Sequence, residues 1–383
     1  MASPEHTATP ELSLPALDLR LVARRAALPL ALAAAAAAVL LLAGGPLGVF
    51  ADALSRAISA DPRWIAVAVV AELLSFAGYI ALFWLVGRRA TPRLGLRAGT
   101  EITFSGAAAT RLLPTAGAGG AALTLWAINK TGMGTKRAGG VLLTFLSLLY
   151  GFFLLGITLS GAAIALGIGG AGHTAVATGA AIAGGTAIVA ALMLAARGGE
   201  TADGAGRVAR GAALLGGSIR DALGFLRGGD ARLLGAPAWW AFDAAVLWAT
   251  FHALGEPPAL AVLAFAYFAG QVGNTIPLPG AASGGTVATL LAFGVAPDLA
   301  LSSVLAYRAI AIWLPAPLGL AALGALRARV ARWSSDDAEA ADLVEAIVAP
   351  AQVAPAAASP RAGQSPLPLP VPYLTPSPCP GSA

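Results

Sequence analysis

Charged side chains are scarce in this chain. Asp, Glu, Lys and Arg make up 11% of the 383 residues, whereas a soluble domain carries about 25%. Hydrophobic residues make up 57%, and the mean hydropathy is +0.77. Such a chain has too few polar groups to cover a water-soluble core, so the composition predicts an all-α polytopic membrane protein.

Cysteine and histidine are almost missing as well. The single cysteine, Cys379, lies in the tail, which excludes a disulfide framework or a thiolate metal site within one chain. His6, His173 and His252 are too scattered to form a ligand cluster. The sequence also lacks a Walker loop, a Gly-x-Ser-x-Gly elbow, a His-Glu-x-x-His helix and a haem signature. We therefore expect no enzyme activity and no cofactor, and an ATP-driven pump encoded by this chain alone is excluded.

Lysine is rare too, and the cations that remain are clustered. Apart from Lys130 and Lys136, the basic residues are arginines that lie between apolar runs, and the net charge is +5. This distribution is typical of cytoplasmic loops rather than of nucleic-acid binding. The Ala, Gly and Arg excess favours a bacterial source. We expect a multi-pass protein of the bacterial cytoplasmic membrane with both termini in the cytoplasm.

Long apolar runs, in contrast, are abundant. They predict six full spans, at about 26–43, 64–86, 139–166, 175–196, 234–254 and 299–326. Residues 1–19 are expected to be a disordered cytoplasmic segment, 20–333 the membrane domain, and 334–383 an acidic and then Pro/Ala-rich disordered cytoplasmic tail. Within the membrane domain, 197–232 has apolar residues at helical spacing among six arginines, which indicates an amphipathic helix on the cytoplasmic surface.

Two membrane-depth segments are broken in the same way. Each is a run of Pro followed by Gly inside a long apolar stretch, and the residues concerned are Pro114, Gly117, Gly119 and Gly120 in the first and Asn274, Pro277, Pro279 and Gly280 in the second. Proline removes a backbone donor and glycine weakens a helix. Lipid cannot satisfy the freed groups, so such breaks occur where protein or a water-filled cavity surrounds them. A matched pair of breaks is typical of a transport site.

The positive-inside rule decides how these segments cross the membrane. If both were full spans, the cluster around Lys130 and the arginines of 197–232 would lie outside. If both are re-entrant hairpins, every Arg cluster is cytoplasmic and the hairpins enter from opposite sides. Opposite entry is what a weak inverted repeat predicts. The spacing agrees, since Pro114 is followed by Gly132 and Pro277 by Gly294.

Four ionisable residues are predicted to lie inside the membrane: Glu72, Arg111, Asp243 and Arg308. A charge at the centre of a spanning helix costs about 2.5–3.5 kcal/mol on insertion scales, so each is a functional hypothesis. The two acids and two bases are also able to pair, and an internal ion pair that only locks helices together is the alternative. Asn274 and the neighbouring Gln271 are candidates to bond freed carbonyls or a lipid headgroup.

Several of these motifs together resemble a known family. They are Arg111-Leu112-Leu113-Pro114 with its glycines, Ile276-Pro277-Leu278-Pro279-Gly280, Phe293-Gly294-Val295, Tyr307-Arg308 and Trp313-Leu314-Pro315. Over about 20–330 the chain is similar to the membrane region of lysylphosphatidylglycerol synthases, which also occurs alone as flippase-like membrane proteins. The resemblance implies movement of a phospholipid between leaflets, with Arg111 and Arg308 near a headgroup cavity.

The chain departs from this family's pattern in two respects. Ala281 and Ser283 stand at glycine positions of the second motif, and Thr286 stands where a Glu is usual, so a mechanism that needs that carboxylate is not implied. The soluble aminoacyl-transferase domain is missing, so lysyl transfer from tRNA is not expected. The expected function is translocation of an anionic phospholipid or lipid-linked intermediate. The alternatives are a non-transporting scaffold in envelope assembly and an ion-coupled solute carrier using Glu72 and Asp243.

Overall fold

The computed structural model describes residues 59–112, 118–168, 175–197, 206–275 and 280–348. At a few of these positions, Arg111 among them, only the backbone is described. The chain divides into two compact units, 1–335 and 336–383, and everything below concerns the first. The predicted span at 26–43, Pro114, Gly117, Pro277 and Pro279 lie outside the described residues, as do the segment 1–19 and the tail from 349.

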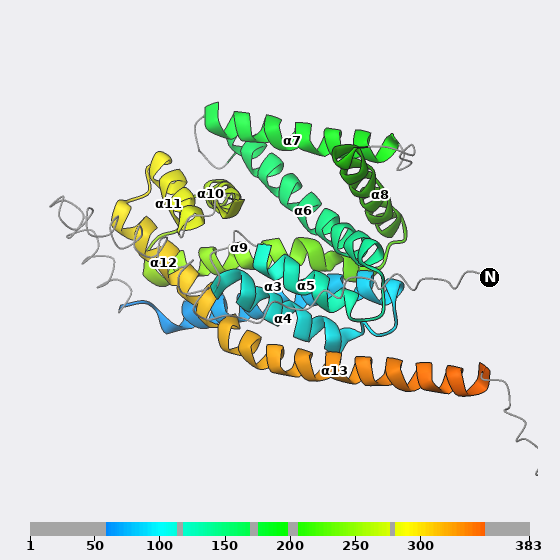
Figure 1. Ribbon diagram of the computed structural model, residues 1–383. Helices are drawn as coiled ribbons and strands as arrows, with labels where there is room; N and C mark the ends of the chain where they lie inside the picture. The colour runs from blue at the N-terminus through cyan, green and yellow to red at the C-terminus, as the bar shows by residue number, and fades with distance from the viewer. Residues whose placement is uncertain (1–58, 113–117, 169–174, 198–205, 276–279, 349–383) are drawn as a thin grey trace, which may run out of the picture. The chain divides into compact units, whose positions relative to one another are not determined.

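The described residues are helical throughout, and no strand occurs among them (Figure 1). The helices are α3 Pro62–Ala90, α4 Leu96–Leu112, α5 Ala118–Asn129, α6 Thr135–Ala165, α7 Ala175–Ala196, α8 Arg207–Arg227, α9 Gly235–Leu254, α10 Leu260–Val272, α11 Ala281–Ala292, α12 Pro297–Trp313 and α13 Pro315–Val348, with short 3₁₀ turns η1 Ala231–Leu234 and η2 Gly273–Thr275. The all-α prediction is confirmed for this part of the chain.

Four helices in the described ranges are long and apolar enough to cross a bilayer. They are α3, α6, α7 and the stretch Pro297–Glu339, which joins α12 to α13. They match four of the predicted spans to within a few residues at their starts. The predicted span at 234–254 forms α9, a helix of 20 residues that is not among these four. The structure thus agrees with a helical membrane protein, and the count of six full spans remains a prediction.

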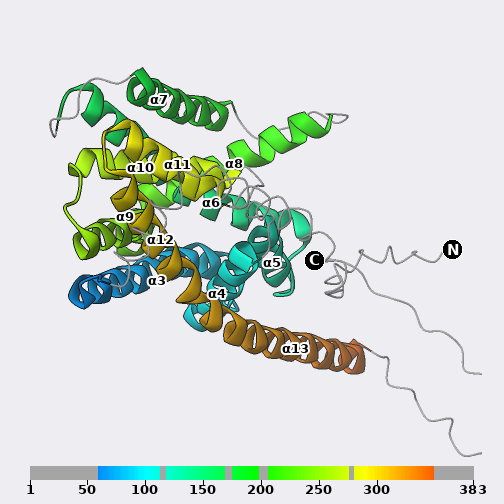
Figure 2. The ribbon, with the colours of Figure 1, turned by 90° about the vertical axis from the view of Figure 1, so that its left-hand side faces the viewer.

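Helices α3 and α9 pack side by side and run antiparallel (Figures 1 and 2). The Asp61 amide donates to the Ala253 carbonyl at one end of the pair, and the Ser75 hydroxyl donates to the Trp239 carbonyl farther along. The backbones approach most closely at Gly78 and Gly235, where a Cβ on Gly235 would lie 2.2 Å from the Gly78 carbonyl oxygen. Such close approach of small residues is a common way for helices to pack in membranes.

Each broken segment consists of two short helices folded back on each other. In the first, α4 and α5 cross where Gly120 contacts Gly106 and Thr110; in the second, α10 and α11 cross where Gly270 meets Thr286. The breaks thus fall between paired antiparallel helices. Thr286 donates to the Ala282 carbonyl at 2.9 Å and packs at this crossing.

Candidate functional site

Asp243, on α9, lies at the centre of a buried polar cluster. Its side chain is 5% exposed. The Tyr267 hydroxyl of α10 donates to Asp243 Oδ2 at 2.5 Å, and the Tyr307 hydroxyl of α12 donates to the same oxygen at 3.0 Å. Both tyrosines are among the most deeply buried large side chains of the described residues. Three helices, α9, α10 and α12, therefore meet at one carboxylate.

An amide side chain connects this cluster to the second break. Gln271, in the last turn of α10, donates from Nε2 to Asp243 Oδ2 at 3.3 Å and to the Tyr307 hydroxyl at 3.1 Å. The exposed Asn274 in η2 donates in turn to Gln271 Oε1. Asn274 and Gln271 thus bond side chains of the cluster, and their contact with freed carbonyls or a lipid headgroup stays a prediction. The chain of contacts runs from the exposed Asn274 of η2 to the buried carboxylate.

Arg308 follows Tyr307 on α12 and is the cation of this region. Its guanidinium carbon lies 5.1 Å from the centroid of the Tyr307 ring. Its Nε and Nη2 atoms are buried and have no hydrogen-bond partner among the described residues, and Asp243 Oδ1 is in the same condition. No salt bridge among the described residues involves Arg308, so the alternative of an internal ion pair that locks helices together is not formed by Arg308 there.

Glu72 is fully buried on α3 and completes the set of charges. The antiparallel register set by the Ser75–Trp239 bond places Glu72 at nearly the same level of the α3–α9 pair as Asp243. The charges of Asp243, Arg308 and Glu72 all act on the Tyr307 hydroxyl. Two acids and one base that the sequence placed inside the membrane thus gather around α12.

The other predicted site residues lie at the two breaks. Arg111 is in the last turn of α4, and Gly119 and Gly120 are at the start of α5. Gly280 is the residue before α11 and has a φ of 82°, a left-handed conformation that glycine adopts without a steric penalty. The structure brings together Asn274, Asp243, Arg308 and Glu72, whereas the Arg111 side chain and residues 113–117 of the first break lie outside what it describes.

Sequence reasoning missed two features of this part of the chain. The first is the role of the tyrosines, although Tyr267 lies four residues before Gln271 and therefore on the same face of α10. The second is a bidentate salt bridge between α4 and α13, in which Arg329 Nε and Nη2 donate to Glu101 at 2.5 and 2.6 Å. Glu101 and Arg329 were not among the candidate residues, because both lie outside the predicted spans.

The cluster has the chemistry of a binding site for an anionic group. Three donors converge on Asp243 Oδ2 and compensate its negative charge. The Nε–Nη edge of an arginine is the geometry that binds carboxylate or phosphate in a bidentate manner. In Arg308 this edge is buried and unoccupied by any described protein group. Among the described residues, no group of three or more His, Cys, Asp and Glu side chains is placed to hold a metal ion.

Comparison with known proteins agrees with the motifs quoted above. The sequence model of the family described as "Lysylphosphatidylglycerol synthase TM region" matches residues 26–319. A search of curated proteins gave no significant match. The matched range includes α3 to α12 and with them both helical hairpins and the whole Asp243 cluster. The chain therefore belongs to the lysylphosphatidylglycerol synthase transmembrane-region family.

Proposed function

We propose that the protein moves an anionic phospholipid, or a lipid-linked intermediate with a phosphate, between the two leaflets of the membrane. The observation that carries this proposal is the buried Nε–Nη2 edge of Arg308, which no described protein group occupies. A buried guanidinium without a partner costs free energy, and a phosphate would remove that cost. The function implied by the family supports the same substrate class.

The hairpins support the proposal through their lengths. At 1.5 Å per residue, the 12 residues of α5 and of α11 extend about 18 Å. The hydrocarbon core of a bilayer is about 30 Å thick. Neither helix is long enough to cross it, which favours re-entrant hairpins that return to the side they entered from. The second break would then adjoin the polar cluster and give a headgroup a path lined by freed backbone groups.

An ion-coupled carrier is the second candidate, and one observation favours it. Asp243 is buried, and its Oδ1 atom accepts no hydrogen bond from a described residue. An acid in this position inside a membrane is a common carrier of a proton or a cation. The two candidates differ in cargo, since only a lipid translocator would use the bidentate edge of Arg308 for a phosphate.

Substitution of Arg308 tests the proposal. Arg308→Lys keeps the positive charge but loses the bidentate Nε–Nη2 edge, and Arg308→Leu removes both the charge and this edge. A charge-assisted hydrogen bond contributes about 1.5–3 kcal/mol, so we expect each variant to slow transbilayer exchange of a labelled anionic phospholipid in liposomes roughly 10- to 100-fold. The same pair of changes at Arg327, an exposed residue of α13, is the control. Full activity of a well-folded Arg308→Leu protein would refute the assignment.

A further inference from the structure

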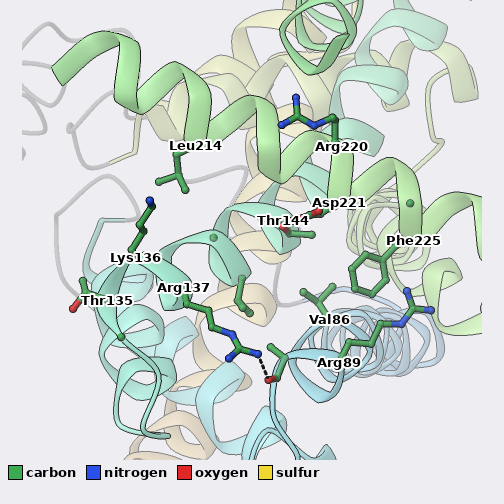
Figure 3. Close-up of a pocket in the computed structure, with 15 residues that line it drawn as sticks. Val86, Arg89, Thr135, Lys136, Arg137, Thr144, Leu214, Arg220, Asp221 and Phe225 are labelled. Atoms are coloured by element: carbon green, nitrogen blue, oxygen red, sulfur yellow. Dashed lines mark hydrogen bonds between the residues drawn. The ribbon is translucent and has the colours of Figure 1, made fainter. Parts of the chain in front are cut away.

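A second charged site lies far from the Asp243 cluster. A cleft of about 960 Å³ opens between the end of α3, the start of α6 and the second half of α8 (Figure 3). On α3 the distance from Glu72 to Arg89 is 17 residues, about 25 Å along the helix. The cleft is therefore separate from the polar cluster by most of the thickness of a bilayer.

The rim of the cleft is basic. Its lining includes the exposed residues Arg89, Lys136, Arg137 and Arg220, and a single acid, Asp221. Neither Lys136 nor Asp221 forms an ion pair with any described residue. Figure 3 shows Lys136 extending toward Leu214 of α8, and Arg137 bonded to the Ala90 carbonyl at 3.1 Å. The rim thus has an excess of positive charge that the surrounding protein does not neutralise.

The start of α6 adds to this excess. Gly134 is its N-cap and provides no side-chain cap, and the first turn of the helix holds no acid. Lys136 and Arg137 instead follow Thr135, the first residue of α6. The N-terminal end of a helix favours negative charge, so these two cations are unfavourably placed there. An anion placed here would accept the free N–H groups and relieve the repulsion between the helix dipole and these cations.

The floor of the cleft is apolar. Four apolar side chains line the cleft beneath the basic rim: Val86, Val141, Leu214 and Phe225. Arg89 lies over the ring of Phe225, with its guanidinium carbon 4.2 Å from the centroid. A small soluble anion would make no favourable contact with this apolar surface. A phospholipid would, because it has an anionic headgroup and an apolar body. The volume is also in the range of about 300–1,000 Å³ that organic ligands occupy.

We propose that this cleft binds one anionic phospholipid, with the phosphate at the Lys136–Arg137 end of α6 and the glycerol and upper acyl region against Val86, Val141 and Phe225. The positive-inside rule predicts that this end of the molecule faces the cytoplasm. The site goes beyond the translocation pathway proposed above, because it is occupied at equilibrium whether or not the protein moves lipid. It recognises the phosphate by charge and the lipid by its apolar part.

The test uses the full chain in liposomes containing phosphatidylglycerol with a photoactivatable group near its glycerol. After illumination, crosslinked peptides are identified by mass spectrometry. We expect crosslinks in 134–144 and 214–225. Gly140 lines the cleft and has open space around it, so Gly140→Leu fills the cleft without a clash and should reduce these crosslinks severalfold. Gly139→Leu is the matched control, since Gly139 is equally open but does not line the cleft.

A second pair of variants tests the charge. Lys136→Gln combined with Arg89→Gln should also lower crosslinking severalfold, while Arg210→Gln combined with Arg227→Gln removes the same charge from exposed positions of α8 outside the cleft and should not. Equal crosslinking in all variants, or equal crosslinking with a phosphatidylcholine probe, would overturn the proposal. Protection by free glycerol 3-phosphate as strong as that by unlabelled phosphatidylglycerol would show a soluble-anion site instead and overturn the lipid assignment.

This outcome is separable from that of the translocation assay. Arg308→Leu, which should slow exchange, leaves the cleft untouched and should crosslink like the unmodified protein. If exchange is absent but crosslinking depends on Gly140 and Lys136, the cleft is a lipid site in a protein that does not translocate. If exchange is present and crosslinking does not depend on them, translocation is supported and the cleft assignment is wrong.

Discussion

Hydroxyl groups, rather than a cation, stabilise the buried carboxylate of Asp243. Tyr267 and Tyr307 donate to its Oδ2 atom, together with Gln271. A pair of acids and bases at similar depth suggested ion pairs, but pairing depends on which side chains the packed helices bring within reach. Because neutral donors bond Asp243 Oδ2, this oxygen does not engage the guanidinium of Arg308. The Nε–Nη2 edge of Arg308 therefore remains available for another anion.

Tyr307→Phe measures the contribution of one of these hydroxyls. The variant keeps the ring and removes a buried donor to Asp243, while Tyr267 and Gln271 still bond the carboxylate. Hydrogen bonds between membrane helices contribute about 1 kcal/mol, so we expect a small decrease in the midpoint of thermal unfolding in detergent. Tyr150→Phe is the control, because Tyr150 is 52% exposed and its hydroxyl bonds no described residue. Identical midpoints would show that the Tyr307 hydroxyl does not support the cluster.

Residue types were predictable here, and contacts were not. The sequence analysis identified Glu72, Asp243 and Arg308 because an ionisable side chain in an apolar run is costly and conspicuous. Tyr267 and Tyr307 are ordinary in such runs, since aromatic residues are common in membrane helices. Their role follows only from the meeting of α9, α10 and α12, which no local pattern encodes. Glu101 and Arg329 are 228 residues apart, and nothing in either segment points to the other.

At the scale of elements, the two hairpins correspond closely. Helices α5 and α11 each have 12 residues, and each is followed by a left-handed glycine, Gly132 with a φ of 92° and Gly294 with a φ of 80°. The Pro and Gly pattern predicted the breaks and this spacing, because both residues act on the local backbone. It did not predict that Gly120 and Gly270 would be crossing points of paired helices, since that requires the partner helix.

Gly120→Leu tests the importance of the first crossing. A Cβ at Gly120 would lie 2.0 Å from Thr110 Oγ1 and 2.6 Å from the Gly106 carbonyl oxygen. Overpacking of this kind typically costs about 1–3 kcal/mol. We expect a lower unfolding midpoint and slower lipid exchange, because α4 and α5 must separate. Gly139→Leu, where a side chain meets open space, should change neither. A Gly120→Leu protein as stable and active as this control would show that the hairpin has no need of close contact.

At the scale of the whole molecule, the two halves repeat one order of elements. Each has one helix, then a hairpin of two helices, and then a further helix, as in α3 to α6 and α9 to α12. The first helices of the two halves, α3 and α9, run antiparallel, which an inverted repeat predicts. Hydropathy was sufficient to predict α3, α6 and α7, because long apolar runs determine them. α9 has a helical pattern but includes Asp243 and three tryptophans, so composition alone does not distinguish a span from a buried helix there.

Exchange of lipid by the purified protein in liposomes is the most direct test of the central claim. Translocation is the function that we propose, and the sequence has no nucleotide-binding motif. We therefore expect the protein to speed transbilayer exchange of a labelled anionic phospholipid or a polyprenyl-phosphate carrier, at a rate that does not change when ATP is added. If a broad panel of anionic lipids and lipid carriers moves no faster than in protein-free vesicles, with and without a proton gradient, the translocation account is wrong and a scaffold role explains the protein better.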